Sequence, residues 1–353
     1  MKIRYPELDA LRGIAAIFVA VYHFTLGQTH PLLQFRVGAT GVELFFIISG
    51  FVIFMSINHV ATAREFIIRR FTRLYPTYWT CVTITFIVTV LAQLSYKAID
   101  LSLWKTYALN LTMLQHYSWV DNLDGSYWTL IIELLFYLVI VLLFILKQLK
   151  HIEVWGGISV FVVGIYNFFV PTSHQGAFRS ERIDFPLVNY LPLFFMGILF
   201  FTIIHEKKDY VRRYILIGLC WLVQFSLFYQ SVRYDLFKTQ WLYGLVLLGY
   251  VGVFTLFVTG KLKWIVNPVT LFFGKISYAF YLIHQFIGVY VLMPKIIAYF
   301  GISLSLASLI AFSSMVLLAS FITFFVEIPA RTKLNASLLS NKKSSPTYLE
   351  SQV

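Results

Sequence analysis

Ten long apolar runs alternate with short polar segments along this chain. Each run is close to the ~20 residues that an α-helix needs to cross ~30 Å of hydrocarbon. The runs are continuous, unlike the short alternating strands of a membrane β-barrel, so we predict an all-α polytopic membrane protein with a bundle of about ten transmembrane helices. The predicted spans are residues 9–27, 40–58, 76–94, 127–147, 153–171, 186–204, 212–230, 240–259, 276–294 and 304–326.

The composition agrees with this class. Of the 353 residues, 59% are hydrophobic and only 12% are charged, and the mean hydropathy is +0.77. Soluble domains carry roughly 25% charged residues, so a soluble protein is excluded. Cys81 and Cys220 both fall within predicted spans. Two cysteines are too few for a disulfide framework, and we expect no metal site.

The basic residues predict the orientation of the chain in the membrane. If the N-terminus is cytoplasmic, 20 of the 28 Lys and Arg residues lie in inside segments. By the positive-inside rule, both termini are therefore predicted to be cytoplasmic. The net charge of +12 does not indicate nucleic acid, because the basic residues are spread over short segments beside the spans, where anionic membrane lipid and topology account for them.

The chain is predicted to form one transmembrane domain over residues 1–330. Residues 331–353 are rich in Ser, Asn and Lys, and this composition predicts a disordered cytoplasmic tail. The longest outside segment, residues 95–126, is rich in Leu and Tyr and has room for a short helix at the outer surface.

Arg12 and His23 are the first candidates for chemistry, because both fall in the first apolar run. Eleven residues are close to three helical turns, which places both side chains within roughly 20° of one face and about 16 Å apart along the axis. An ionisable group inside hydrocarbon is costly and usually faces a cavity, so we predict a functional role for His23. The alternative is a neutral imidazole that forms a hydrogen bond between helices.

Two carboxylates, Glu43 and Glu133, are predicted at a depth comparable to that of His23. Counting from the ends of the spans places the three groups within ~4–9 Å of the outer boundary, with His284 somewhat deeper. A histidine with a carboxylate partner is a general base that can take a proton from a hydroxyl group. The alternative is that these glutamates only connect helices.

Four arginines lie in one predicted cytoplasmic segment: Arg64, Arg69, Arg70 and Arg73. Arg70 and Arg73 are three residues apart on a predicted short helix that ends before Pro76, a spacing that suits bidentate binding of phosphate groups. The alternative is that these arginines reflect only the positive-inside rule, which places basic residues in cytoplasmic segments. An extended pantetheine arm is about as long as the ~16 Å between Arg12 and His23, so a nucleotide bound by arginines could present a thioester to the histidine.

Together these residues resemble the acyltransferase 3 family of ten-helix membrane enzymes over nearly the whole chain. Arg12 and His23 match its Arg-x10-His signature. Four further blocks match in the right order and on the expected helices: GVELFFIISGF at 41–51, RFTR at 70–73, SYWTLIIE at 126–133 and GKISYAFYLIH at 274–284. Glu43 departs from the aspartate of many members but keeps the carboxylate.

The resemblance implies that an acyl group, usually acetyl, moves from cytoplasmic acetyl-CoA to a hydroxyl of an extracytoplasmic or lipid-linked glycan, in the cytoplasmic membrane of a bacterium. It implies that His23 is the catalytic residue, supported by Arg12, and that Arg70 and Arg73, with neighbouring Arg69, serve the acyl-CoA. We expect five residues of the last two blocks to contact substrate: Tyr127, Trp128, Ser277, Tyr278 and His284. Some members carry a fused extracytoplasmic domain, whereas this sequence ends soon after the tenth predicted span. We therefore expect this chain to act alone or with a separate extracytoplasmic partner.

Two mechanisms and two rival functions stay open on the sequence. The imidazole of His23, oriented by Glu133 or Glu43, either deprotonates the hydroxyl directly or accepts the acetyl group first. A proton-coupled transporter or flippase of an anionic or glycolipid substrate is the main rival, although the hydropathy pattern lacks matching broken helices in two halves. A structural membrane subunit would leave the intramembrane histidine and glutamates unexplained.

Overall fold

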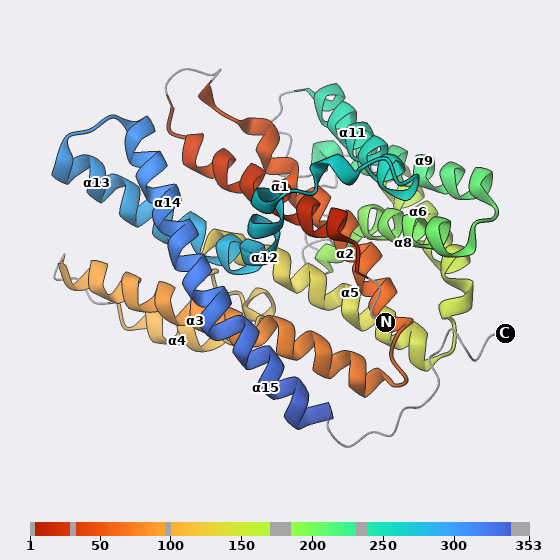
Figure 1. Ribbon diagram of the computed structural model, residues 1–353, viewed down its shortest axis with the longest axis horizontal. Coiled ribbons are helices and arrows are strands. Elements are labelled where there is room, and N and C mark those ends of the chain that lie inside the picture. The colour runs from red at the N-terminus through yellow and green to blue at the C-terminus, as the bar shows by residue number, and fades with distance from the viewer. Residues whose placement is uncertain (1–3, 29–32, 96–99, 170–184, 231–238, 340–353) are drawn as a thin grey trace.

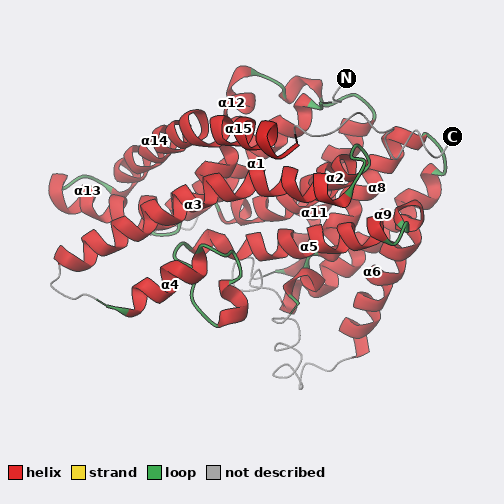
Figure 2. Cartoon of the chain, turned by 90° about the horizontal axis from the view of Figure 1, so that it is seen from below, coloured by secondary structure: helices red, strands yellow, loops and turns green. Residues whose placement is uncertain are grey.

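The computed structural model describes residues 4–28, 33–95, 100–169, 185–230 and 239–339 (Figures 1 and 2). Within these ranges the regular structure is entirely helical. The main helices are α1 (Pro6–Thr25), α2 (Gly41–Ile57), α3 (Ala63–Ser95), α4 (Ser102–Asn110), α5 (Trp128–Ile145), α6 (Ile152–Phe169), α8 (Leu191–Glu206), α9 (Tyr210–Ser226), α11 (Gln240–Val258), α12 (Pro268–Ile283), α13 (Met293–Phe300), α14 (Leu304–Ile322) and α15 (Ile328–Leu339). Two π-helical segments, η10 (His284–Leu292) and η11 (Thr323–Glu327), join α12 to α13 and α14 to α15.

Each of the ten predicted spans coincides with a helix. In the part of the chain that the structure describes, eight helical segments are long and apolar enough to cross a membrane. The other two predicted spans form α8, with 16 residues, and α9, with 17. The prediction of an all-α, multi-pass membrane protein is confirmed.

Helix α1 lies at the centre of the bundle, between α12 and α2 (Figure 1). The crossing of α1 and α12 is very close, because each helix has a glycine there that faces the backbone of the other helix. A Cβ atom on Gly13 would overlap the carbonyl oxygen of Thr270, and one on Gly274 would overlap that of Asp9. Small residues at helix contacts let backbones approach in this way inside membranes.

Helix α3 corrects one prediction, because it runs through Pro76 as a single helix of 33 residues. A proline removes a helical N–H and normally ends or kinks a helix, which is why a separate short helix was expected before it. Here Leu74 and Tyr78 on either side are buried, and Tyr278 Oη donates a hydrogen bond to the Leu74 carbonyl at 3.2 Å. The packing of neighbouring helices around this stretch makes the proline tolerable.

The predicted disordered tail is wrong for residues 331–339, which belong to α15. This helix packs along α3, and Thr72 Oγ1 donates a hydrogen bond to Asn335 Oδ1 at 2.9 Å (Figure 1). The polar composition of α15 therefore reflects a helix at the edge of the bundle. Residues 340–353 of the predicted tail lie outside the described residues.

The two ends of the described chain lie on one side of the bundle, since Arg4 and Arg331 line the same cavity. At the opposite end, only the last part of the segment before α5 folds inward. The segment contains the predicted short helix, α4, and three residues after α4, Asp124, Ser126 and Tyr127, are buried. Helix α5 therefore begins inside the protein.

Candidate active site

Arg12 and His23 both face the segment formed by α12 and η10, as their spacing on α1 predicts. Arg12 lines a cavity together with Ser277 and Tyr278 of α12. Three turns further along α1, His23 contacts His284, the first residue of η10. One helix face therefore connects two polar sites.

The histidine pair is the first of these sites. His23 Nδ1 lies 3.0 Å from His284 Nε2, and the ring centroids are 5.0 Å apart. His284 is almost fully buried, whereas His23 is partly exposed. The imidazole of His23 is therefore accessible, while its partner is enclosed by protein.

The hydrogen bonds of the pair assign the positions of the protons when both rings are neutral. His284 Nδ1 lies 2.8 Å from the carbonyl oxygen of Tyr281, which can only accept a hydrogen bond, so Nδ1 carries the proton. His284 Nε2 is then an acceptor, and His23 Nδ1 must donate to it. Nε2 of His23 is consequently the nitrogen with a basic lone pair.

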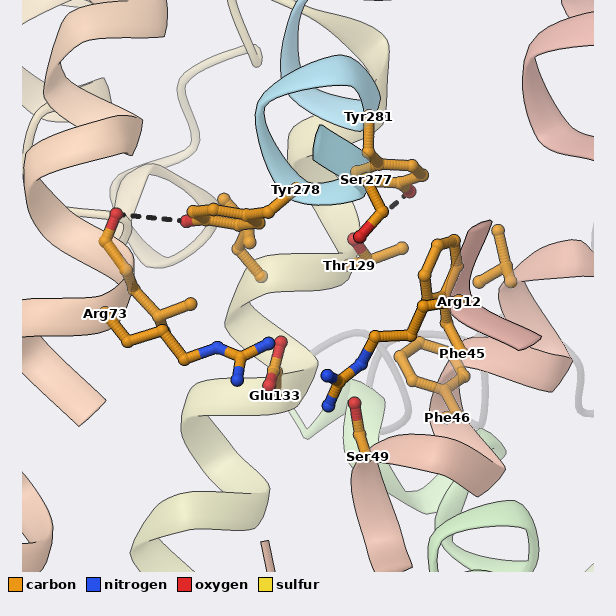
Figure 3. Close-up of a pocket in the computed structure, with 13 residues that line it drawn as sticks. Arg12, Phe45, Phe46, Ser49, Arg73, Thr129, Glu133, Ser277, Tyr278 and Tyr281 are labelled. Carbon is orange, nitrogen blue, oxygen red and sulfur yellow. Dashed lines mark hydrogen bonds between the residues drawn. The ribbon is translucent and has the colours of Figure 1, made fainter. Parts of the chain in front are cut away.

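The second site is a central cavity of about 80 Å³ (Figure 3). Arg12 of α1 and Arg73 of α3 point into the same space as Glu133 of α5. The Arg12 guanidinium also lies 3.5 Å from the Asp9 carboxylate. Tyr281 lines the cavity too, and since its carbonyl bonds to His284, it connects the central cavity to the histidine pair.

Glu133 corrects the expected grouping of His23 with two carboxylates. It shares a cavity with Arg12 and Arg73, and Tyr137 Oη donates a hydrogen bond to it at 2.5 Å. Counting residues from the start of α5 overestimated its proximity to the outer surface, because α5 begins inside the protein. Among the described contacts, the residue that bonds to His23 Nδ1 is His284.

Glu43 lies elsewhere, in the first turn of α2. It is fully buried, and Tyr243 Oη of α11 lies 3.4 Å from its Oε1. It is not among the residues that line the central cavity. The structure thus separates Glu43 from Glu133, which the sequence placed together.

A basic chamber of about 600 Å³ adjoins the central cavity. The two share Arg12, Arg73, Ser277 and Tyr278, so they lie next to each other. The charged residues of the chamber are five basic and two acidic: Arg4, Arg12, Arg73, Lys275 and Arg331, and Asp9 and Glu327. This chamber has the charge and size to bind an anionic organic molecule.

An arginine cluster forms a smaller hollow of about 140 Å³ beside the chamber. It contains the expected residues Arg69, Arg70 and Arg73, together with Arg331 and Asn335 of α15. Arg69 is already bonded to Glu65 at 2.7 Å, whereas Arg70 Nε has no hydrogen-bond partner among the described residues. The sequence missed Arg331 because it falls in the predicted tail. Its spacing of four residues from Glu327 was the only local signal.

Tyr127 and Trp128 were expected to contact substrate, but neither lines these cavities. Tyr127 is fully buried, with its ring against Tyr78. Trp128 packs against Tyr190 and Phe46. The structure therefore places Tyr127 in the core and half-buried Trp128 against it, while Ser277 and Tyr278 of the same prediction do line the central cavity.

Asp124 is a further residue that the sequence analysis missed. Its carboxylate is fully buried and accepts hydrogen bonds from Ser126 and from the backbone amide of Phe286 in η10. Burial raises the pKa of Asp124 to about 6, although these hydrogen bonds oppose the shift. An Asp-Gly-Ser turn is the only local sign of it in the sequence.

The fold and site define a class: a multi-pass helical membrane protein with a basic chamber at Arg12 and a partly exposed histidine, His23, three turns along the same helix. The chain belongs to the acyltransferase 3 family, whose model, described as an acyltransferase domain, matches residues 5–325. It is therefore an enzyme that transfers acyl groups.

Several relatives agree with this assignment. A protein of the Acidianus two-tailed virus, provisionally named an acetyltransferase, is 25% identical over 93% of this chain and 91% of its own length. Proteins of Staphylococcus aureus, provisionally named O-acetyltransferases, are 27% identical over 80% of this chain, which spans about half (50%) of their length. A peptidoglycan O-acetyltransferase of Listeria monocytogenes is 31% identical over 24% of this chain and 14% of its own. No solved structure matches the chain.

Proposed function

We propose that this enzyme is a membrane O-acetyltransferase that moves an acetyl group from acetyl-CoA to a hydroxyl of a glycan, with His23 as the residue that activates the hydroxyl. One observation carries the proposal. The basic chamber and the central cavity meet at Arg12, and three turns along the same helix the accessible His23 is bonded to His284.

The donor in this proposal enters from the predicted cytoplasmic side. Arg73 and Arg331 line both the chamber and the arginine cluster, and guanidinium groups bind phosphates through paired hydrogen bonds. Glu327 Oε2 and Thr323 Oγ1 are buried without hydrogen-bond partners among the described residues, and both residues line the chamber. These oxygens are suitable acceptors for the amide N–H groups of a pantetheine arm that extends past Arg12.

The proposed chemistry is general-base acyl transfer. His23 Nε2 removes the hydroxyl proton, the oxygen attacks the thioester carbonyl carbon, and the C–S bond breaks. The imidazolium returns the proton to the CoA sulfur, so the products are an acetyl ester and free CoA thiol. A route in which His23 first accepts the acetyl group gives the same products.

His284 takes the orienting role that the sequence analysis gave to a carboxylate. By accepting the hydrogen bond from His23 Nδ1, it holds the catalytic ring in one orientation and tautomer, as the carboxylate does in a serine-hydrolase triad. Glu133, in turn, offsets the charge of Arg12 and Arg73 beside the path of the thioester. Arg12 supports the reaction from this position.

The proposed acceptor is a carbohydrate on the opposite side of the membrane, either in the envelope or linked to lipid. Its support is the name of the Listeria monocytogenes relative, a peptidoglycan O-acetyltransferase. The relatives from Staphylococcus aureus and Listeria monocytogenes also favour the cytoplasmic membrane of a bacterium, although a viral relative exists. Membrane lipid is a further partner in the proposal, and the enzyme acts either alone or with a separate extracytoplasmic protein.

Transfer of radiolabelled acetyl from acetyl-CoA to glycan in membranes tests the proposal. We expect His23→Ala to lower the rate by about 10²- to 10⁴-fold, the usual contribution of a general base. The control is His151→Ala, which removes an exposed histidine that lines a different cavity. Transfer that survives His23→Ala rejects the mechanism, and no label in glycan with the wild-type enzyme favours the transporter.

A further inference from the structure

One buried carboxylate outside the cavities connects the segment before α5 to the histidine pair. Asp124 Oδ2 accepts a hydrogen bond of 2.7 Å from the backbone amide of Phe286, which lies 162 residues away in the sequence. Asp124 Oδ1 accepts two more, from the amide and the hydroxyl of Ser126, at 2.8 and 2.7 Å. These bonds hold the carboxylate in one orientation.

The amide that Asp124 binds lies at a change of helix type. Phe286 is in the first turn of η10, where the bonding pattern passes from that of α12 to that of a π-helix. Amides at the start of a helix have no intrahelical partner, and a buried amide without an acceptor is costly. Nearby, the carbonyl of Tyr281 accepts the hydrogen bond from His284 Nδ1.

The packing around this bond is also close. A Cβ atom on Gly125 would lie 2.8 Å from the amide group at the flexible end of the Gln285 side chain. Gln285 stands between His284 and Phe286 in the chain. The turn at Asp124 and Gly125 therefore contacts the first turn of η10 at Gln285 and Phe286.

We propose that Asp124 is a positioning residue for the histidine pair: its bond to the Phe286 amide fixes the first turn of η10, and with it the place of His284 beside His23. The inference rests on the proposed function for its catalytic consequence. Asp124 does not touch substrate, since its carboxylate is fully buried among protein donors. It acts through His284, whose ring orients His23.

Kinetics of purified enzyme variants test the catalytic part. We expect Asp124→Ala to lower kcat about 10- to 100-fold, because small displacements of a catalytic group are costly, and to leave KM for acetyl-CoA within about 2-fold. Asp124→Asn, which keeps one acceptor oxygen, should lower kcat less than Asp124→Ala does. In a His284→Ala background, Asp124→Ala should cause no further loss, a result that general destabilisation does not produce.

The matched control is Asp121→Asn, which changes an exposed aspartate of the same segment. Hydrogen exchange of the peptide that covers residues 284–292 gives a readout independent of activity. Exchange should be faster in Asp124→Ala and Asp124→Asn than in the wild type, and unchanged in Asp121→Asn. If Asp124→Ala does not fold, the Asn variant carries the comparison.

Each outcome has one meaning. Wild-type kcat and wild-type exchange in Asp124→Asn and Asp124→Ala overturn the inference, as does an additive loss in the His284→Ala background. If the wild type transfers no acetyl group, the proposed function fails. Faster exchange confined to the Asp124 variants would then still support the link between Asp124 and η10.

Discussion

The imidazoles of His23 and His284 form a polar contact inside a mostly apolar bundle. The fixed carbonyl of Tyr281 assigns the proton of His284, and His284 in turn assigns that of His23. This chain of hydrogen bonds makes Nε2 the basic nitrogen of His23, the atom that takes the hydroxyl proton in the proposed function. A second histidine can thus orient the base without adding a buried negative charge, which is expensive to place in a membrane.

A substitution of His284 tests the orienting role at the residue scale. We expect His284→Ala to lower kcat about 10- to 100-fold, less than His23→Ala, because the base stays present but loses its fixed orientation. The KM for acetyl-CoA should change little, since His284 lies outside the chamber. Steady-state kinetics on purified protein measures both, and a loss equal to that of His23→Ala would indicate that His284 itself contacts the substrate.

The sequence identifies some residues of the candidate site and misses others. Arg12 and His23 were predicted because two ionisable groups on one face of an apolar helix are unusual and costly. Asp124 and Arg331 were not, because their partners are distant in the sequence: the bond from Phe286 to Asp124 closes across 162 residues. A local pattern carries no signal for such a contact.

At the scale of elements, the geometry of the site depends on the close crossing of α1 and α12. These two helices carry Arg12 and His23 on one side and Ser277, Tyr278 and, through η10, His284 on the other. The glycines at the crossing set the distance between the helix backbones. A larger side chain there must push apart the helices that form both polar sites.

The variant Gly274→Ala tests this crossing, because its Cβ would overlap the Asp9 carbonyl oxygen. We expect a loss of stability of about 1–3 kcal/mol, typical of overpacking, measured as a lower unfolding midpoint in detergent. The matched control is Gly252→Ala on α11, whose Cβ would meet no atom within 4 Å. It should be neutral or slightly stabilising, since alanine favours helices. Equal midpoints for the two variants would contradict the role of the crossing.

The sequence predicted which segments are helices, but it predicted less well where those helices end and how deep their residues lie. Long apolar runs reflect the lipid environment directly, and every predicted span became a helix. Pro76 and the polar residues of α15 obscured two helices, because neighbouring helices stabilise them there. The predicted depth of Glu133 was wrong for a related reason: three residues just before α5, Asp124, Ser126 and Tyr127, are buried within the protein.

At the scale of the whole molecule, the basic chamber and the histidine pair lie along one helix, α1. Arg12 and Arg73 line both the chamber and the central cavity, and the carbonyl of Tyr281, which also lines the central cavity, accepts a hydrogen bond from His284. In the proposed function, the donor approaches from one side of the membrane and the acceptor from the other, so neither substrate has to cross the bilayer.

The contribution of α15 to the chamber is testable through Arg331. We expect Arg331→Ala to raise KM for acetyl-CoA about 10-fold with little change in kcat, because a charge-assisted hydrogen bond to phosphate is worth roughly 1.5–3 kcal/mol. Arg331→Lys should restore only part of this loss, since lysine cannot bind phosphate in bidentate fashion. Lys333→Ala, an exposed residue of the same helix, is the control. An unchanged KM in Arg331→Ala would remove α15 from the donor site.

The most direct test of the central claim uses the enzyme in sealed vesicles of known orientation, with membrane-impermeant labelled acetyl-CoA on one face and glycan acceptor on the other. We expect transfer only when the donor is on the face that bears Arg73 and Arg331, and we expect His23→Ala to lower its rate by about 10²- to 10⁴-fold. Transfer that requires both substrates on the same face, or that keeps the wild-type rate in His23→Ala, would contradict the account.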